Sequence, residues 1–336
     1  MDAIGKSSYF LPSYESKGFR ELLSFYSNRL SYNDLDGLLT RVVGQRPYCV
    51  SHLQNKVIEE SERAATYLHQ MPPNQQLSLN FVDEVDIYEA EGDEITYLDD
   101  GVGVKRQNER RRCKDTLGFK STKRVQTDVI GIGNQKQGFI YLSSAESTSL
   151  SAELEDKIHL ILSRNYNNKP LPLVAITDGA TVIRKRVRKL FGKNVPILLD
   201  WYHLEHKVRQ YSSRLGLTKD VKETHIDEML AYLWKGQTME ALIYSDVMIN
   251  TKRPNILEEL QNYLCKHKDE ICDYGKRQAL GKTIGSGRGE KANDILVAHR
   301  QKKKGMSWSQ KGSQALAILK SLEINQKWDA YWNTIT

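Results

Sequence analysis

Apolar side chains recur at helical spacing over the first seventy residues. They follow this pattern through 15–30, 31–43 and a segment that starts near Pro47, which predicts three helices. The hydroxyl of Ser31 can accept from free amides at the start of the second helix, and Gly44 is placed to end it. The polar stretch 71–80 has paired prolines and predicts a linker.

From residue 81 the pattern becomes that of short strands mixed with helices. Strands are expected at 95–104, 124–132, 139–143, 171–177 and 195–200, and helices at 151–164 and 180–191. The connection GNQKQG between the second and third strands favours a hairpin. This order predicts a mixed sheet with helices packed on it. The segment 203–281 reads as helices only, and further helices are expected over 292–304 and 308–319.

The composition is that of a globular protein of two or three domains. The chain has 336 residues, of which 39% are hydrophobic and 27% charged. No apolar run is long enough to span a bilayer, and the first ten residues lack an apolar signal core, so neither membrane insertion nor secretion is expected. The four cysteines form no CxxC pair, which argues against a zinc ribbon or a disulfide scaffold.

Positive charge gives a first indication of a partner. Lys and Arg exceed Asp and Glu by 49 − 42 = 7, and the isoelectric point is about 9.0. A basic protein with few, scattered cysteines favours a cytoplasmic location and a nucleic-acid partner.

Three acidic residues stand at the ends or centres of predicted elements. Asp100 lies on the first strand, Asp178 just after the fourth, and Glu290 where a glycine-rich turn enters a helix. Phosphodiester cleavage by two Mg²⁺ ions needs anionic oxygen ligands, and carboxylates at the carboxyl ends of strands are well placed to supply them. Mn²⁺ would suit the same ligands.

The same residues have ordinary interpretations. An Asp-Gly pair is most often a turn, and a glutamate at a helix start is usually a favourable partner of the helix dipole. Asp99 could replace Asp100, since strand alternation lets only one of them face a site, and Asp128 on the second strand is a weaker rival.

Beyond these patterns, the sequence over residues 90–335 resembles the ribonuclease-H-like core of DDE transposases. The local motifs are similar to those of one branch of bacterial insertion-sequence transposases, the Kra type and its relatives. The matching motifs are Asp100-Gly101, Asp178-Gly179-Ala180, LDWYHL with Asp200 and His203, and IGSGRGE followed by HRQKKKGMSWS. The chain departs from the family at Gly289, where an apolar residue is usual, and in lacking an N-terminal cysteine cluster.

The resemblance implies an α/β fold, with a ribonuclease-H-like mixed sheet interrupted by an all-helical insertion. It implies that Asp100, Asp178 and Glu290 are catalytic and hold two Mg²⁺ ions. Asp100 would bridge both ions. The implied reaction is hydrolysis of the 3′ strand at each element end, followed by attack of the 3′-OH on target DNA. Asp200 and His203 either orient this site or support the junction between strand and insertion.

The N-terminal helices are candidates for reading DNA. The segment around Gly44 fits a helix-turn-helix, although an ordinary three-helix bundle would show the same spacing. The outward candidates are Arg46, Ser51, Gln54, Asn55 and Lys56. Gln and Asn can read adenine edges.

Three basic clusters stand elsewhere in the chain, at 110–112, 184–189 and 302–304. Charge runs usually solvate a surface. Because Lys302, Lys303 and Lys304 follow Glu290 closely, they are expected to contact phosphates.

These observations predict a helix-turn-helix domain at 1–70, a linker at 71–80, a catalytic core at 81–202 and 282–336, and a helical insertion at 203–281. The expected function is a transposase that acts as a homodimer or larger assembly on double-stranded DNA, without membrane contact. A catalytically inactive DNA-binding derivative, and a metal-dependent nuclease or resolvase without strand transfer, are the alternatives.

Overall fold

The computed structural model describes residues 16–44, 48–69, 81–82, 84–89, 94–107, 124–134, 136, 138–144, 158, 162–163 and 171–335. The chain folds into two compact units. The helical unit is Met1–Gln70, Val102–Thr127 and Asp294–Thr336, and the sheet unit is Met71–Gly101 and Asp128–Asn293.

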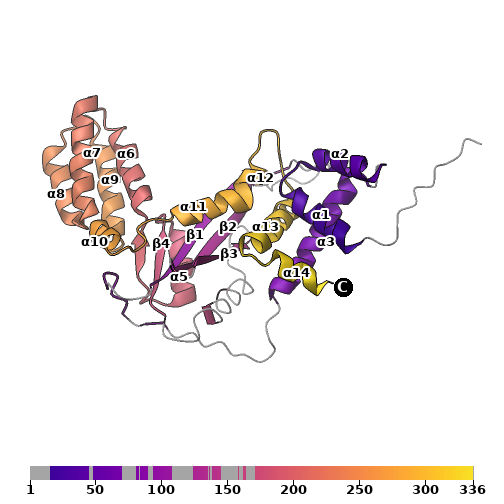
Figure 1. Cartoon of the computed structure of the whole chain (residues 1–336). Coiled ribbons are helices and arrows are strands. Elements are labelled where there is room, and N and C mark those ends of the chain that lie inside the picture. Colours follow the sequence, from indigo (N-terminus) through magenta and orange to yellow (C-terminus); the bar gives the residue numbers. More distant parts are fainter. Residues whose placement is uncertain are drawn as a thin grey trace, which may run out of the picture. The chain divides into compact units, whose positions relative to one another are not determined.

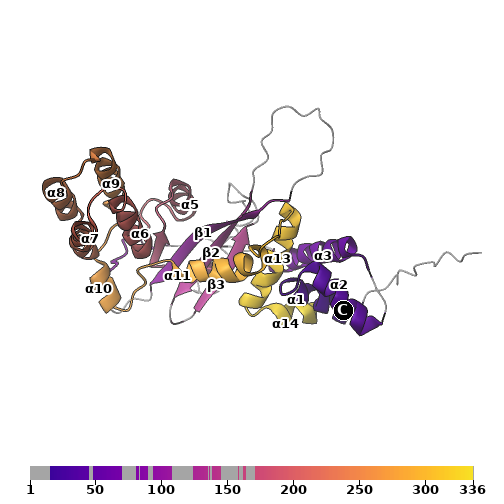
Figure 2. The same cartoon turned by 90° about the horizontal axis from the view of Figure 1, so that it is seen from above.

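The helical unit is built from both ends of the chain. Its elements are α1 (Lys17–Ser27), α2 (Tyr32–Val43), α3 (Val50–His69), the π-helix η1 (Asp294–Ala298), α12 (His299–Gln301), α13 (Gln310–Ile324) and α14 (Trp328–Thr334). Helix α3 packs against α13 and α1 (Figure 2). The expected ends of α2 are confirmed, because Ser31 accepts from the backbone of Asp34 at 3.1 Å and Gly44 has a φ of 81°.

One mixed sheet of five strands gives the sheet unit its name. Its strands are β1 (Ile95–Lys105), β2 (Arg124–Asn134), β3 (Gly138–Ser144), β4 (Leu173–Thr177) and β5 (Ile197–Leu199), in the order β3-β2-β1-β4-β5. The pair β2–β3 is the expected antiparallel hairpin, whereas β4 runs parallel to both β1 and β5. The expected helix at 151–164 and the linker at 71–80 lie almost wholly outside the described residues.

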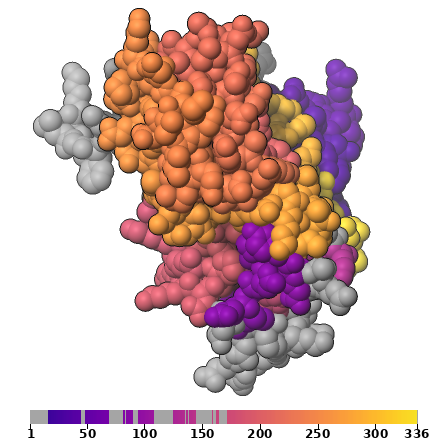
Figure 3. Space-filling model, turned by 90° about the vertical axis from the view of Figure 1, so that its left-hand side faces the viewer, coloured from indigo at the N-terminus to yellow at the C-terminus, as the bar shows by residue number. Residues whose placement is uncertain are grey.

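Helices cover both faces of this sheet. Helix α5 (Thr181–Phe191) packs on one face through Ile183 and Val187, and α11 (Gly287–Asn293) lies across the other (Figure 1). The chain between β5 and α11 forms a helical bundle, whose outer surface is salmon to orange in Figure 3. Its helices are α6 (Trp201–Ser212), α7 (Lys219–Trp234), α8 (Thr238–Met248), α9 (Pro254–His267) and α10 (Tyr274–Ala279).

The bundle and the sheet share one apolar core. Leu98 and Ile176 of the sheet belong to the same buried cluster as Leu204, Leu260 and Tyr274 of the bundle. Burying apolar surface of this kind is the main source of folding stability, so the bundle is an integral part of the sheet unit. None of the described helices is both long enough and apolar enough to cross a membrane.

Candidate active site

Asp200 closes the strand β5 and begins the helix α6. It is fully buried. Its Oδ1 atom accepts from the backbone nitrogens of Tyr202 at 2.6 Å and His203 at 3.1 Å, as an N-cap residue does. Its Oδ2 atom accepts from the backbone nitrogen of Ser286 at 2.5 Å and also from the Ser286 hydroxyl. Asp200 therefore ties the start of the bundle to the turn that leads into α11.

His203 lies one helical turn into α6, beside Asp200. The two side chains are 3.5 Å apart, measured from His Nδ1 to Asp Oδ2, and Nδ1 has no hydrogen-bond partner among the described residues. The Asp200 carboxylate raises the pKa of His203 above its usual value, and the charges of Asp178 and Glu290 add to this effect. Burial would raise the pKa of Asp200, but its hydrogen bonds with His203 and Ser286 outweigh burial and lower it.

The side chain of Asp100 lies on the face of the sheet that α11 covers, where it meets Asn293. Its Oδ1 atom accepts from the backbone of Gly101 at 2.7 Å, and its Oδ2 atom accepts from the side chain of Asn293 at 2.5 Å. Burial raises the pKa of Asp100, and the nearby negative charge of Asp178 raises it further, whereas His203 opposes the shift. Asp178 and His203 are therefore close enough to Asp100 to affect its ionisation.

Asp178 and Glu290 lie on either side of the helical bundle in the sequence, Asp178 before it and Glu290 after it. Asp178 follows β4, and its Oδ1 atom accepts from the backbone of Ala180 at 2.8 Å in the turn that opens α5. Glu290 lies in the first turn of α11 and is exposed. A Cβ atom built on Gly289 would stand 3.5 Å from Cβ of Leu98, so the glycine lies directly against the sheet.

The structure places Asp178 near both Asp100 and His203, and Glu290 near His203. A metal site shared by Asp100, Asp178 and Glu290 stays a prediction. Asp100, Asp178 and Glu290 form no ion pair with any lysine or arginine in the described part of the chain. Ligand atoms of Asp200, His203 and Glu290 lie within 4.8 Å of one another, which is a spacing that a metal ion could use. Asp200 already accepts from four donors, so we assign it to positioning rather than to metal ligation.

Asp99 and Asp128, the rivals for the site, face α5 instead. Asp99 lies 2.9 Å from Nη1 of Arg186, and Asp128 lies 2.8 Å from Nη2 of the same side chain. The hydroxyl of Tyr97 also donates to Asp99. Burial raises the pKa of Asp99 to about 6, and Arg186 opposes that shift. These two carboxylates are structural.

Sequence reasoning did not find two residues that hold the cluster in place. Asn293 contacts Asp100, and Ser286 contacts Asp200. A signal for Asn293 was present, because it stands three positions after Glu290 and so shares its helix face. Ser286 lies in the IGSGRGE motif, but nothing in the pattern indicates its contact with Asp200, which is 86 positions away in the chain.

Comparison with known proteins places the chain in a family. The model of the uncharacterised protein family UPF0236 matches residues 148–330, which include Asp178, Asp200, His203 and Glu290. The chain belongs to UPF0236. No curated protein matches it in sequence.

Among solved structures, this UPF0236 chain is similar to the Drosophila P element transposase strand transfer complex. The TM-score is 0.33 and the identity 12%, over 94% of this chain and 80% of that chain. A likeness at this level carries no argument.

The side chains expected to read DNA lie in the helical unit of the UPF0236 chain. Ser51, Gln54 and Asn55 are exposed on α3, and Lys56 lies 3.1 Å from Glu59 in an ion pair. Arg46 falls outside the described residues, as does the cluster 110–112. A helix-turn-helix at this position remains a prediction.

The two described basic clusters differ in their surroundings. Lys302, Lys303 and Lys304 are exposed between α12 and α13. In α5, Arg184 pairs with Glu270 at 3.1 Å, and Arg188 donates to the backbone of Lys193 and Val195. The arginines of α5 thus have structural partners, whereas the lysine run is open to solvent.

Proposed function

We propose that this protein is a DDE-type transposase of a bacterial insertion sequence. In this proposal Asp100, Asp178 and Glu290 hold two divalent cations, Mg²⁺ or Mn²⁺, for cleavage of the 3′ strand and its transfer to target DNA. The observation that supports it is the nearness of Asp178 to Asp100 and of Asp178 and Glu290 to His203, with no basic partner for the three carboxylates in the described part of the chain. The mixed five-stranded sheet supports a ribonuclease-H-like core.

The contrast between the two faces of the sheet strengthens this argument. On the α5 face, the guanidinium of Arg186 pairs with both Asp99 and Asp128. On the α11 face, Asp100 is near Asp178 and receives only hydrogen bonds from Gly101 and Asn293. Asp100 and Asp178 are half-buried and have no basic partner among the described residues, so a bound cation would stabilise them.

The ligand chemistry fits the proposed ions. Carboxylate oxygens are the ligands that Mg²⁺ and Mn²⁺ prefer. Two such ions supply an activated nucleophile and stabilise the leaving oxygen in phosphodiester cleavage. Asn293 holds one oxygen of Asp100, and Asp200 orients His203 at the edge of the cluster, which fixes both side chains before DNA arrives.

The test is a strand-transfer assay with Mg²⁺ on duplexes taken from the sequences that flank the gene. Wild type should give joined product, and Asp178→Asn and Glu290→Gln should lose it while still binding DNA. Asp227→Asn and Glu228→Gln, which change exposed acids of α7, are the matched controls and should remain active.

Each other outcome points to a different function. Cleavage without joining would make the protein a metal-dependent nuclease or resolvase. DNA binding without cleavage would make it an inactive derivative. Equal activity of wild type and Asp178→Asn would remove Asp178 from the mechanism.

A further inference from the structure

A cavity of about 380 Å³ lies within the helical unit, between α2, α3 and the segment around residues 305–312. Aromatic and apolar groups form part of its wall, among them Tyr32 and Trp308, and Gln54 and Asn55 of α3 line it as well. No aspartate or glutamate is among its lining residues. The cavity is therefore not suited to a cation.

Arg300 supplies the positive charge of this cavity. Its side chain is almost fully buried, with 3% of the residue exposed. Nε donates to the backbone oxygen of Ser27 at 2.8 Å, and Nη1 contacts the sulfur of Met306 at 3.0 Å. Among the described residues, no carboxylate pairs with Arg300, and its Nη2 atom has no hydrogen-bond partner.

Two aromatic rings hold the guanidinium in place. It lies 4.8 Å from the ring centroid of Trp308 and 5.9 Å from that of Tyr32, which are distances of cation–π contacts. Burial lowers the pKa of Arg300, while Tyr32 and Asp34 oppose that shift. Because a buried cation without a paired anion is unfavourable, the free edge of Arg300 is set to receive an anion.

The KGMSWS motif explains how the cavity is built. Trp308 is fixed by backbone hydrogen bonds, from its nitrogen to Lys105 and from Gln107 to its oxygen, and its ring nitrogen donates to Gln301. This places Ser307 at the cavity, exposed to solvent. Its hydroxyl and the amides of Gln54, Asn55 and Gln107 are further donors around Arg300.

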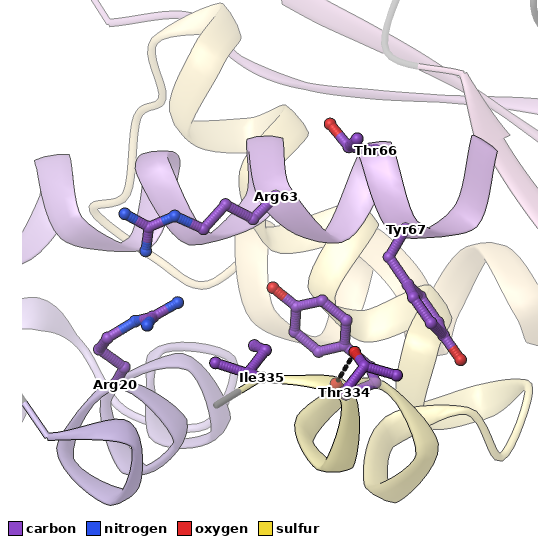
Figure 4. Close-up of a pocket in the computed structure, with 7 residues that line it drawn as sticks. Arg20, Arg63, Thr66, Tyr67, Thr334 and Ile335 are labelled. Atoms are coloured by element: carbon purple, nitrogen blue, oxygen red, sulfur yellow. Dashed lines mark hydrogen bonds between the residues drawn. The ribbon is translucent and has the colours of Figure 1, made fainter. Parts of the chain in front are cut away.

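A second cavity of the helical unit also contains arginines, but their charge is already paired. It measures about 560 Å³, and Arg20 of α1 and Arg63 of α3 extend into it (Figure 4). Both guanidinium groups pair with the buried carboxylate of Glu60, at 2.7 and 3.1 Å. Their charge is already matched, so this cavity has no comparable demand for an anion.

We infer that the cavity at Arg300 binds a phosphate group of a DNA strand, with the guanidinium of Arg300 as its main ligand. Arginine binds phosphate through several directed donors, and amides and hydroxyls commonly add to such a contact. The exposed run Lys302–Lys304 follows Arg300 directly and adds positive charge for the neighbouring backbone. This inference rests on the proposed DNA-binding function, and it adds one defined contact to it.

The experiment measures the affinity of the full chain for a short DNA duplex over a range of salt concentrations. Wild type is compared with Ser307→Glu, Arg300→Gln and Arg300→Lys. A plot of log K against log salt has a negative slope, and each lost phosphate contact makes it less steep by about 0.9. We expect Ser307→Glu and Arg300→Gln to weaken binding and to make the slope less steep by that amount. Arg300→Lys should keep the steepness of wild type.

Ser213→Glu is the matched control, because it places the same charge on an exposed serine in the bundle of the sheet unit. It should leave the slope unchanged. Should Arg300→Gln fail to fold, as judged by its thermal melt, Ser307→Glu decides the question, since that side chain is exposed.

A second arm separates DNA from free phosphate compounds. Inorganic phosphate and a nucleoside monophosphate are added at fixed ionic strength, and the thermal stability of wild type and Arg300→Gln is recorded. Stabilisation of wild type by the nucleotide, combined with an unchanged DNA slope in Ser307→Glu and Arg300→Gln, would overturn the inference in favour of a mononucleotide site.

An unchanged slope in both variants with no ligand response would also overturn it. Neither result would affect the proposed function, which the strand-transfer assay tests by itself through Asp178.

Discussion

Asp99 and Asp100 are neighbours in β1 and face opposite sides of the sheet. Asp99 meets Arg186 at 2.9 Å on the side of α5, and Asp100 meets Asn293 at 2.5 Å on the side of α11. Alternation of side chains along a strand gives two identical residue types two different environments. Asp99 has Arg186 as its counter-charge, whereas Asp100 has the carboxylate of Asp178 nearby.

The first prediction compares these two residues. Asp99→Asn should lower the free energy of unfolding by about 2–4 kcal/mol, because it breaks a buried pair. Asp100→Asn should leave stability within about 1 kcal/mol of wild type, since it relieves repulsion with Asp178, yet it should abolish strand cleavage. Urea denaturation and the strand-transfer assay measure the two effects, and the reverse pattern would contradict the assignment of the two faces.

Arg186→Gln should produce an unusual dependence of stability on pH. Burial already raises the pKa of Asp99 to about 6, from an ordinary 3.8. A folded pKa above the unfolded one means that the folded state binds more protons between these values, so stability falls as pH rises through that window. Without Arg186 the folded pKa rises further and the window extends upward.

We therefore expect Arg186→Gln to lose about 3–5 kcal/mol at neutral pH and to recover part of it near pH 5. Denaturation curves at both pH values, with wild type beside the variant, measure this. Lys185→Gln, which changes an exposed residue of the same helix, is the control. A loss that is the same at both pH values would show that the two carboxylates do not need Arg186 as a counter-charge.

Asp200→Asn should bring the pKa of His203 down towards 6.5. The Asp200 carboxylate is the largest cause of its rise. Because the folded pKa of His203 is raised, its contribution to stability is complete below pH 6.5 and is lost as pH rises through the folded pKa. Titration of the His203 ring by NMR, in metal-free buffer, measures the shift. Asp227→Asn is the control, and an unchanged titration in Asp200→Asn would exclude the pairing.

Gly179→Ala should disturb the turn that carries Asp178. Gly179 has a φ of 84°, and a Cβ atom there would stand 2.7 Å from Cε1 of the buried His267. Backbone strain and this clash should together cost about 2–4 kcal/mol. Gly192→Ala also strains the backbone, at a φ of 85° and a ψ of −176°, but it leaves open space around the new methyl group, so it should cost the backbone strain alone, about 1–3 kcal/mol. Equal losses in urea denaturation would show that the contact with His267 is unimportant.

Local pattern predicted most of the fold, because apolar periodicity and end signals act over a few residues. Ser31 and Gly44 marked the ends of α2, and the strand and helix segments appear close to the expected positions. The pattern left Asp99 and Asp100 undecided, since alternation says that they differ but not which face carries α11. The partners Arg186, Asn293 and Ser286 come from distant segments, and only tertiary packing reveals them.

The hydrogen bonds between Asp200 and Ser286 close the helical bundle at its base, together with the backbone bond from Trp201 to Ile284. The chain enters the bundle at Asp200 and leaves it at Ser286, and these two residues are in contact. Insertions or deletions within the bundle therefore need not change the separation of His203 and Glu290. Among relatives, variation in length should accumulate between these two anchor points while the spacing from Ser286 to Asn293 stays constant.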